Sequence, residues 1–456
     1  MYLAIPRNVY ARRYGDFFYL FNQTTWASAL IKNAIAFEGV FTRTPTTAEQ
    51  ISTRISNAYQ QPYSSVKSDL RELATPLIAD GFLLCGKNAH DLWSKPKLKH
   101  APHAESHHET KGEAESPEDL LYAYFRSSPN PFELDIDLTQ ACTERCIHCY
   151  APAYGAHSLD FKLIEKVFGE FRAMGGLKVK LTGGECMLHT NFVDILKMAR
   201  AHDFVISVLS NLTVCGAFFL EAIKATDVAV VQTSLYGADA QTHEMVTRLP
   251  GSFTKTMNAI KRLRKSGVQV QIHCPLMKQN AHTIEAVRKI GEDLGVKTTF
   301  DAAIMARANH DNSNCSCALT DDMLVSFLQS QRILDKYTGT KTFAMMPDAP
   351  VCNIGIARIC LSATGDYYPC SGCYEYYLGK CNQMTLCDVW NGERMTRLRS
   401  IRFKDMDKCQ SCDLLPYCSV CPTRNFNATN SLFIPDPLLC RIAKIKHDLA
   451  SHETET

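Results

Sequence analysis

The sequence predicts an α/β fold centred on a partial (β/α)6 TIM-type barrel, and three observations support this prediction. About six apolar strand candidates alternate with helical stretches from Phe132 onward, a pattern typical of parallel sheets. A winged-helix-like α+β pattern precedes them, and cysteines dominate the chain after Val351. Six units are fewer than the eight of a closed barrel. We therefore expect an open or partly closed barrel between two smaller domains.

The first domain is expected over residues 1–94. It begins with a hairpin, "VYARRYGDFFYLFN", whose turn is Gly15-Asp16. One helix opens with a capping-box pattern at residues 46–49, a second covers residues 64–80, and "FLLCG" closes the domain as a strand. A winged helix that binds DNA needs a basic recognition helix. The second helix mixes charges, so the sequence predicts no nucleic-acid partner.

A polar stretch over residues 95–117 reads as a mobile linker. Its histidines offer metal binding as an alternative interpretation. The barrel is expected over residues 118–336 and a cysteine-rich domain over residues 337–456. The barrel strands are expected in six segments: "FELDIDLT", "GLKVKLTGG", "FVISVLSN", "VAVVQTSLYG", "VQVQIHCPLM" and "VKTTFDAAIM".

Composition limits the class of protein. The chain has 456 residues, 46% apolar and 21% charged, with a formal net charge of +2. It carries no apolar run long enough to span a bilayer and no secretory signal, so we expect a cytoplasmic protein without a membrane partner. Cysteine is enriched, at 20 residues. Clustered cysteines in such a chain indicate metal or iron–sulfur binding rather than a secreted disulfide framework.

Two motifs follow the first two barrel strands, where the chemistry of a barrel lies. Cys142, Cys146 and Cys149 have the spacing C-x3-C-x2-C, and "LTGGEC" ends at Cys186. Four thiolates complete a zinc site or a cubane cluster, whereas three leave one position open. A structural zinc knuckle is the alternative. Both motifs should lie on one rim.

Residues from about Phe132 to Lys336 resemble the radical S-adenosylmethionine (radical SAM) enzymes. The resemblance implies that Cys142, Cys146 and Cys149 hold a [4Fe–4S] cluster whose fourth iron binds S-adenosylmethionine. Gly183, Gly184 and Glu185 match the family's Gly-Gly-Glu element, although Cys186 stands where proline is usual. Further cofactor contacts are implied at strand ends and beside the cluster: His148, Ser210, Asn211, Ser234 and Arg248.

The C-terminal cysteines resemble the SPASM extension, which binds two auxiliary [4Fe–4S] clusters. The first implied ligand set is Cys352, Cys360, Cys370 and Cys421, and the second is Cys409, Cys412, Cys418 and Cys440. With the radical SAM cluster, the resemblance implies three [4Fe–4S] clusters. Paired C-x2-C units also make zinc ribbons, which is the alternative. Five further cysteines in or near this part of the chain are unassigned: Cys315, Cys317, Cys373, Cys381 and Cys387.

Residues 5–86 resemble the PqqD-like peptide-recognition element, the fold of the peptide chaperone of pyrroloquinoline quinone biosynthesis. Such modules add a precursor's leader to a sheet edge as a strand. The sequence thus predicts an enzyme that cleaves S-adenosylmethionine and cross-links a ribosomally made precursor peptide, with a reductase, flavodoxin or ferredoxin as electron donor.

The favoured cross-link is a thioether. A carbon–carbon cross-link through an aromatic ring, epimerisation, and a non-enzymatic iron–sulfur or zinc regulator are the alternatives, and so is maturation of a folded protein.

Overall fold

The computed structural model describes residues 1–32, 40, 42–93, 116–151, 154–330, 347–406 and 408–453. The chain divides into two compact units. The first is Met1–Ser128 with Asp203–Val205, and the second is Pro129–His202 with Ile206–Thr456. Nearly all of the expected linker, residues 95–117, lies outside the described residues.

The first unit contains two three-stranded antiparallel sheets, ordered β2-β3-β4 and β5-β1-β6. Its strands are β1 (Tyr2–Ala4), β2 (Val9–Tyr14), β3 (Phe17–Asn22), β4 (Ala27–Lys32), β5 (Thr46–Thr47) and β6 (Leu84–Gly86). Its helices are α1 (Ala48–Tyr59), α2 (Tyr63–Ala79), α3 (Ala89–Trp93) and α4 (Pro117–Ser127). The expected hairpin, second helix and closing strand are all present.

Local chemistry explains these elements. Tyr14 pairs with Phe17 across the hairpin turn, where Gly15 has a φ of +54°, a conformation that glycine adopts at little cost. The capping box of α1 uses Thr47 and Gln50 rather than Thr46 and Glu49, one residue later than the sequence pattern suggested.

Helix α4 packs on the β2-β3-β4 sheet of the first unit. The rings of Phe125 and Tyr14 meet edge to face at 5.0 Å, and those of Tyr124 and Phe17 at 5.5 Å. This compact unit therefore includes α4 and ends at Ser128, whereas the sequence placed the first domain at residues 1–94 and the start of the barrel at residue 118.

The second unit is built on a nine-stranded sheet ordered β12-β11-β10-β9-β8-β7-β13-β14-β15. All six expected barrel strands are present and parallel. They are β7 (Glu133–Asp137), β8 (Lys178–Thr182), β9 (Val205–Leu209), β10 (Val230–Ser234), β11 (Val270–Pro275) and β12 (Lys297–Asp301). The partial TIM-type barrel is confirmed.

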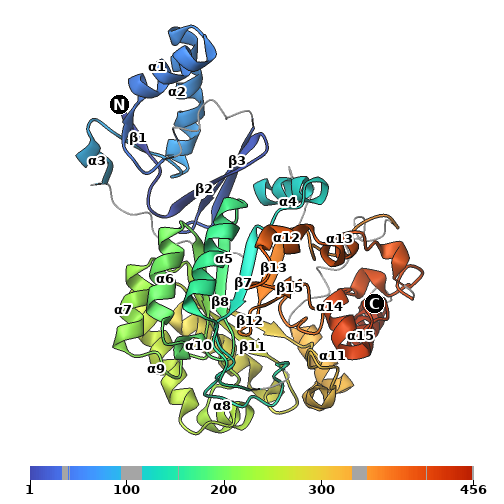
Figure 1. Ribbon diagram of the computed structural model, residues 1–456. Helices are drawn as coiled ribbons and strands as arrows, with labels where there is room; N and C mark the ends of the chain where they lie inside the picture. Colours follow the sequence, from blue (N-terminus) through green and yellow to red (C-terminus); the bar gives the residue numbers. More distant parts are fainter. Residues whose placement is uncertain are drawn as a thin grey trace. The chain divides into compact units, whose positions relative to one another are not determined.

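Helices cover the outer face of this sheet (Figure 1). They are α5 (Phe161–Ala173), α6 (Phe192–Ala201), α7 (Ala217–Ala225), α9 (Ser252–Lys265) and α10 (Ile284–Leu294), whereas α8 (Ala240–Thr247) packs on α9 and α11 (Asp321–Ser330) packs on α15 (Pro437–Glu453). Strand residues such as Leu134, Ile136, Leu181 and Ile206 are completely buried. Apolar and polar residues alternate along strands such as β7 (ELDID) and β8 (KVKLT), as expected for strands with one face packed on helices.

The cysteine-rich region extends the barrel sheet. Strand β13 (Arg358–Leu361) runs parallel to β7, and β14 (Asp366–Tyr368) and β15 (Gly379–Lys380) continue antiparallel. Four helices complete the region: α12 (Leu386–Asn391), α13 (Glu393–Arg399), α14 (Pro422–Thr429) and α15 (Pro437–Glu453). The sequence did not predict β13, whose four residues are too short for a periodic signal. Among the described residues, no helix has the length and apolar character needed to cross a membrane.

Candidate active site

The loop after β7, residues 138–151, carries Cys142, Cys146 and Cys149, and we call it the cysteine loop. The end of α8 holds it in place, because the backbone N–H groups of Arg145 and Ile147 donate to the carbonyls of Thr247 (2.9 Å) and Val246 (3.1 Å). The three cysteines are half-buried. Burial raises the pKa of Cys142 to about 11, so its thiol keeps its proton at neutral pH until a metal replaces it.

The "TGGEC" turn after β8 packs directly against the cysteine loop. The N–H groups of Gly184 and Glu185 donate to the carbonyls of Thr139 (2.7 Å) and Ala141 (2.8 Å). A Cβ atom on Gly184 would lie 2.3 Å from the Ala141 carbonyl oxygen, and one on Gly183 would lie 2.5 Å from that of Thr139. The two glycines therefore let this turn approach the cysteine loop, and the expected shared rim is confirmed.

Glu185 links the turn to the end of β9. Its carboxylate is completely buried and accepts hydrogen bonds from Ser210 Oγ (2.8 Å), the Asn211 N–H (2.8 Å) and the Met187 N–H (3.0 Å). Burial raises the pKa of Glu185, and these hydrogen bonds act against the rise. The resemblance to radical SAM enzymes implies that this carboxylate binds the ammonium group of the cofactor, which stays a prediction. Its hydrogen bonds also hold the backbone after β9 in place.

Asn211 brings the end of β9 to the first cysteine. Its Nδ2 donates to Thr143 Oγ1 (2.9 Å) and lies 3.8 Å from Cys142 Sγ. Four sequence-predicted positions, Cys142, Glu185, Ser210 and Asn211, are therefore joined by hydrogen bonds.

The remaining predicted cofactor contacts are more dispersed. The His148 ring packs edge-on against Tyr236 at 5.1 Å, and its Nδ1 is buried without a hydrogen-bond partner among the described residues. Burial lowers the pKa of His148 to about 4, so the ring is neutral at pH 7. Ser234 ends β10 and contacts the Tyr236 hydroxyl. Arg248 caps α8 with a φ of +55°, and its side chain is exposed.

Sequence analysis missed two residues beside the second cysteine. Cys146 Sγ lies 3.2 Å from the carboxylate of Glu144 and 3.8 Å from the Tyr236 hydroxyl. Both partners are buried, and burial raises the pKa of Glu144 to about 7. Glu144 could have been found from the sequence, because it lies between two predicted thiol ligands. A carboxylate at this position would repel an anionic cluster.

A buried polar network, which no sequence pattern predicted, connects β7 with the cysteine-rich region. Tyr368 donates to Asp137 Oδ2 at 2.6 Å, and Tyr374 also hydrogen-bonds this carboxyl. Tyr374 stacks on Tyr150, which follows the last cysteine of the cysteine loop, with ring centres 6.4 Å apart. Burial raises the pKa of Asp137 to about 6, although both tyrosines lower it.

The first predicted auxiliary set comes together from four separate segments. Cys360 lies on β13, Cys370 follows β14 and Cys421 precedes α14, while Cys352 lies in the loop before β13. Burial raises the pKa of Cys352 to about 12, and the charges of Cys421 and Cys370 add to this effect. Cys360 is likewise close enough to Cys370 for their charges to interact. Cys373, which the sequence left unassigned, is a fifth thiol near Cys370 and Cys421.

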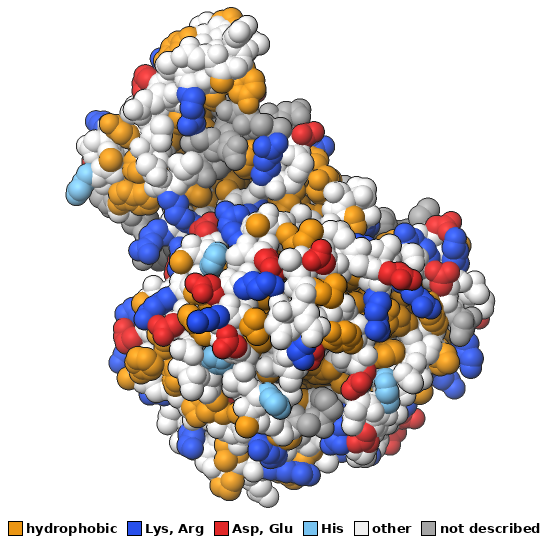
Figure 2. Space-filling view, in the orientation of Figure 1, with side chains coloured by type: hydrophobic (Ala, Val, Ile, Leu, Met, Phe, Trp, Pro, Cys, Tyr) orange, Lys and Arg blue, Asp and Glu red, His pale blue; other side chains and the backbone are white. Residues whose placement is uncertain are grey.

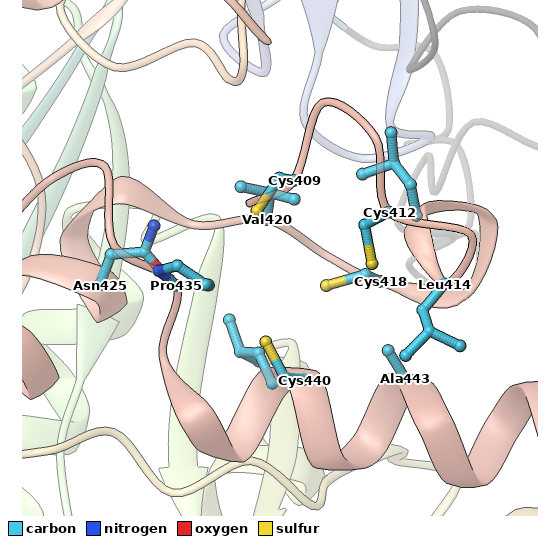
Figure 3. Close-up of a pocket in the computed structure, with 11 residues that line it drawn as sticks. Cys409, Cys412, Leu414, Cys418, Val420, Asn425, Pro435, Cys440 and Ala443 are labelled. Carbon is cyan, nitrogen blue, oxygen red and sulfur yellow. The ribbon is translucent and has the colours of Figure 1, made fainter. Parts of the chain in front are cut away.

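The second predicted set lines one pocket. Figure 3 shows the sulfur atoms of Cys409, Cys412, Cys418 and Cys440 around a common space between a loop and α15. The other lining side chains are mostly apolar, including Leu414, Leu415, Val420, Leu439 and Ala443. Burial raises the pKa of Cys418 to about 12, with contributions from the other three cysteines. Four thiols in an apolar pocket fit a cubane cluster.

Within the described residues, no three His, Cys, Asp or Glu side chains are already arranged around a point that suits a single metal ion. The thiols around a cubane bind different irons. The two four-cysteine sets and the cysteine loop are the groups that could hold such clusters.

Comparisons with known proteins identify two domains in the chain. Residues 136–290 match the model of the radical SAM superfamily, and residues 352–413 match that of the SPASM iron–sulfur cluster-binding domain. The chain therefore contains a radical SAM domain and a SPASM domain. Neither match extends over residues 1–128.

Two curated relatives are similar to about two thirds of the chain. The AdoMet-dependent heme synthase of Methanosarcina barkeri is 22% identical over 329 residues, which is 66% of this chain and 94% of that protein. The antilisterial bacteriocin subtilosin biosynthesis protein AlbA of Bacillus subtilis is 24% identical over 319 residues, 66% of this chain and 69% of AlbA.

A solved structure resembles nearly the whole chain. The structure of Streptococcus suis SuiB bound to the precursor peptide SuiA superposes with a TM-score of 0.64 at 14% identity, covering 96% of this chain and 99% of SuiB. At this identity the likeness shows the fold.

Proposed function

We propose that this protein cleaves S-adenosylmethionine and uses the resulting 5′-deoxyadenosyl radical to modify a ribosomally made precursor peptide. The observation that carries the proposal is the packing of the three-cysteine loop on a Gly-Gly-Glu turn within a radical SAM domain. Cys142, Cys146 and Cys149 would hold a [4Fe–4S] cluster with three thiolates and leave one iron free for the cofactor. When reduced, such a cluster would supply the electron that cleaves S-adenosylmethionine.

The residues around Cys142 are the proposed cofactor site. The Gly183–Gly184–Glu185 turn, Ser210 and Asn211 meet there. His148 in the cysteine loop and Ser234 at the end of β10 both contact Tyr236. We propose that these residues, with Arg248, contact S-adenosylmethionine.

The two four-cysteine sets are proposed to hold auxiliary [4Fe–4S] clusters, so the loaded chain would carry three. The first set is Cys352, Cys360, Cys370 and Cys421, and the second is Cys409, Cys412, Cys418 and Cys440. Their grouping in space and the SPASM match support this assignment. Such clusters could accept an electron from a substrate radical or bind a substrate thiolate.

The first unit is proposed to bind the leader of the precursor. Each of its small sheets has outer strands, and an extended peptide can add to such an edge through backbone hydrogen bonds. The fold likeness to SuiB, solved with a precursor peptide, covers 96% of this chain and supports this role. Binding the leader would raise the effective concentration of the core peptide at the barrel.

The proposed product is an intrapeptide thioether from cysteine sulfur to carbon, and a carbon–carbon link through an aromatic ring is the alternative. Both reactions remove two hydrogens, so mass spectrometry of the peptide after thiol alkylation separates them. A blocked cysteine supports the thioether, while a free cysteine with the same mass loss supports the carbon–carbon link. An unchanged peptide mass would exclude both.

The heme synthase relative favours a second candidate, a radical SAM enzyme that acts on a tetrapyrrole. The match covers 94% of that relative but only 66% of this chain. The fold likeness to SuiB, solved with a precursor peptide, extends over 96% of this chain, which favours the peptide substrate. Incubating the loaded protein separately with the precursor and with a tetrapyrrole, and measuring 5′-deoxyadenosine, tests the choice directly.

A further inference from the structure

An open groove lies between the loop of residues 212–216 and helix α9, beside the cysteine loop. Three of its lining side chains, Lys255, Lys261 and Arg262, are cations, and no lining residue is acidic. We call this surface the basic groove. Lys255 and Lys261 are exposed. Within the described part of the chain, neither lysine forms an ion pair, whereas Arg262 donates to the carbonyl of Cys215 at 2.6 Å.

The charged side chains of helix α9 are all positive. It contains five cations and no acidic residue over Ser252–Lys265. Elsewhere, on the face that Figure 2 shows, basic and acidic side chains are interspersed, in keeping with the net charge of +2. A single-sign surface on a nearly neutral molecule attracts a partner of the opposite charge.

Both walls of the basic groove connect to the cysteine loop through hydrogen bonds. Thr213, in one wall, lies 2.7 Å from Thr143 through their hydroxyl oxygens. Thr256, on α9, donates to the Asn211 carbonyl at 2.8 Å, and the Asn211 side chain reaches Cys142 Sγ at 3.8 Å. Two hydrogen bonds through Asn211 therefore link Thr256, on the helix that carries the lysines of the groove, to Cys142.

An exposed aromatic residue adjoins the basic groove. Phe218, in the first turn of α7, follows the lining residue Gly216 by two positions and is 70% exposed. It is the most exposed large hydrophobic side chain that the structure describes. An apolar contact beside cations suits a protein surface better than a free inorganic anion.

We propose that the basic groove, with Phe218, is the docking surface for a small acidic one-electron carrier protein. The proposal rests on the proposed function, which needs one electron for each S-adenosylmethionine cleaved. The reduced carrier would give up one electron and so become oxidised by one electron. The cluster that Cys142, Cys146 and Cys149 are proposed to hold would accept this electron and pass it to S-adenosylmethionine, which breaks into methionine and the 5′-deoxyadenosyl radical. Electron transfer slows steeply with distance, so the carrier must dock close to this loop. Transient redox complexes bury little area and rely on charge complementarity for fast association.

Charge reversal tests the proposal in the loaded, anaerobic enzyme with purified flavodoxin as the probe. We expect Lys255→Glu with Lys261→Glu to lower flavodoxin affinity by about tenfold or more and to weaken its dependence on salt. Flavodoxin-driven cleavage of S-adenosylmethionine should fall with it, whereas dithionite-driven cleavage should not. The matched control, Lys162→Glu with Lys289→Glu, reverses two exposed lysines on α5 and α10 and should bind flavodoxin normally.

Three results would overturn this assignment. One is unchanged flavodoxin affinity in the groove variant, and another is an equal loss of affinity in the control. The third is a raised KM for the precursor peptide with flavodoxin affinity intact, which would make an acidic peptide segment the occupant. Absence of dithionite-driven cleavage by the wild-type enzyme would instead contradict the proposed function. Flavodoxin binding is measured independently of cleavage, so the failure of one proposal can be distinguished from the failure of the other.

Discussion

Each cysteine of the cysteine loop has a different environment, although the motif looks regular in sequence. Cys142 is approached by Asn211, whereas Cys146 lies between Glu144 and Tyr236. Burial raises the pKa of Cys146 well above its usual range, and the nearby Glu144 charge raises it further. A free thiolate is therefore costly here, and a positively charged metal centre would offset that cost.

Substitution of Cys146 should abolish the cleavage of S-adenosylmethionine. We expect Cys146→Ala to eliminate cleavage of S-adenosylmethionine, because two thiolates cannot retain the cluster, and to remove about four irons per chain. Cys387→Ala is the matched control, since Cys387 is exposed and belongs to neither proposed set. Chromatographic measurement of 5′-deoxyadenosine checks both, and wild-type cleavage by Cys146→Ala would contradict the assignment.

Asp137 should make stability depend on pH. Its carboxyl titrates near 6 in the folded protein and near 3.8 when unfolded. Between these values the folded state binds more protons, so stability falls as pH rises through this window, by up to ~3 kcal/mol. Asp137→Asn keeps an oxygen acceptor for Tyr368 and removes the charge.

We therefore expect the free energy of unfolding to fall less in Asp137→Asn than in wild type between about pH 4.5 and 7. Anaerobic denaturant titration at the two pH values measures this difference. Parallel pH profiles for the two proteins would show that Asp137 does not carry the effect.

At the level of elements, the site depends on how closely two loops approach. The turn after β8 fits against the cysteine loop only because residues 183 and 184 lack side chains. We expect Gly184→Ala to displace the cysteine loop and to reduce both iron content and cofactor cleavage severely, since its Cβ would meet backbone at 2.3 Å.

Gly169→Ala provides the control for this prediction. Gly169 lies within α5, and a Cβ there would meet nothing within 4 Å. This variant should keep full activity and gain roughly 0.5–1 kcal/mol in stability, because alanine favours the helix. Iron quantitation and thermal unfolding measure both variants, and equal iron content in the two would refute the steric argument.

Much of this arrangement could be predicted from strand order. Parallel strands end at the same rim, so the loops after β7 and β8 had to meet, and the alternating apolar runs located all six barrel strands. The network of Asp137, Tyr368 and Tyr374 could not be predicted. It depends on β13 adding to β7, a pairing between residues more than 220 positions apart.

The hydrogen-bond partners of the Glu185 side chain could not be predicted from the sequence either. The Gly-Gly-Glu pattern located Glu185, but nothing in it indicated that Ser210, Asn211 and Met187 would occupy the carboxylate oxygens. Those contacts depend on the separation of β8 and β9, which tertiary packing determines.

For the whole molecule, the account predicts that the second auxiliary set is separable from cofactor cleavage. Cys440 lies on α15 and Cys142 follows β7. We expect Cys418→Ala with Cys440→Ala, which leaves only two thiolates in this set, to lower the iron content from about twelve to about eight per chain. Cofactor cleavage without peptide should persist, while peptide modification should fall. Iron analysis and peptide mass spectrometry check this, and an unchanged iron content would exclude this set as a cluster site.

The role of the first unit is best tested by competition. If it binds the leader, an isolated leader peptide added in excess should inhibit modification of the full precursor but leave peptide-independent cofactor cleavage unchanged. A scrambled leader of equal composition is the control. Equal inhibition by the two peptides would argue against specific strand addition.

The most direct test of the central claim is a single anaerobic reaction of the iron-loaded protein with S-adenosylmethionine, dithionite and the precursor peptide, followed by chromatography and mass spectrometry. We expect 5′-deoxyadenosine, methionine and a peptide lighter by two hydrogens. A protein that contains zinc without an iron–sulfur chromophore and leaves S-adenosylmethionine intact would contradict it.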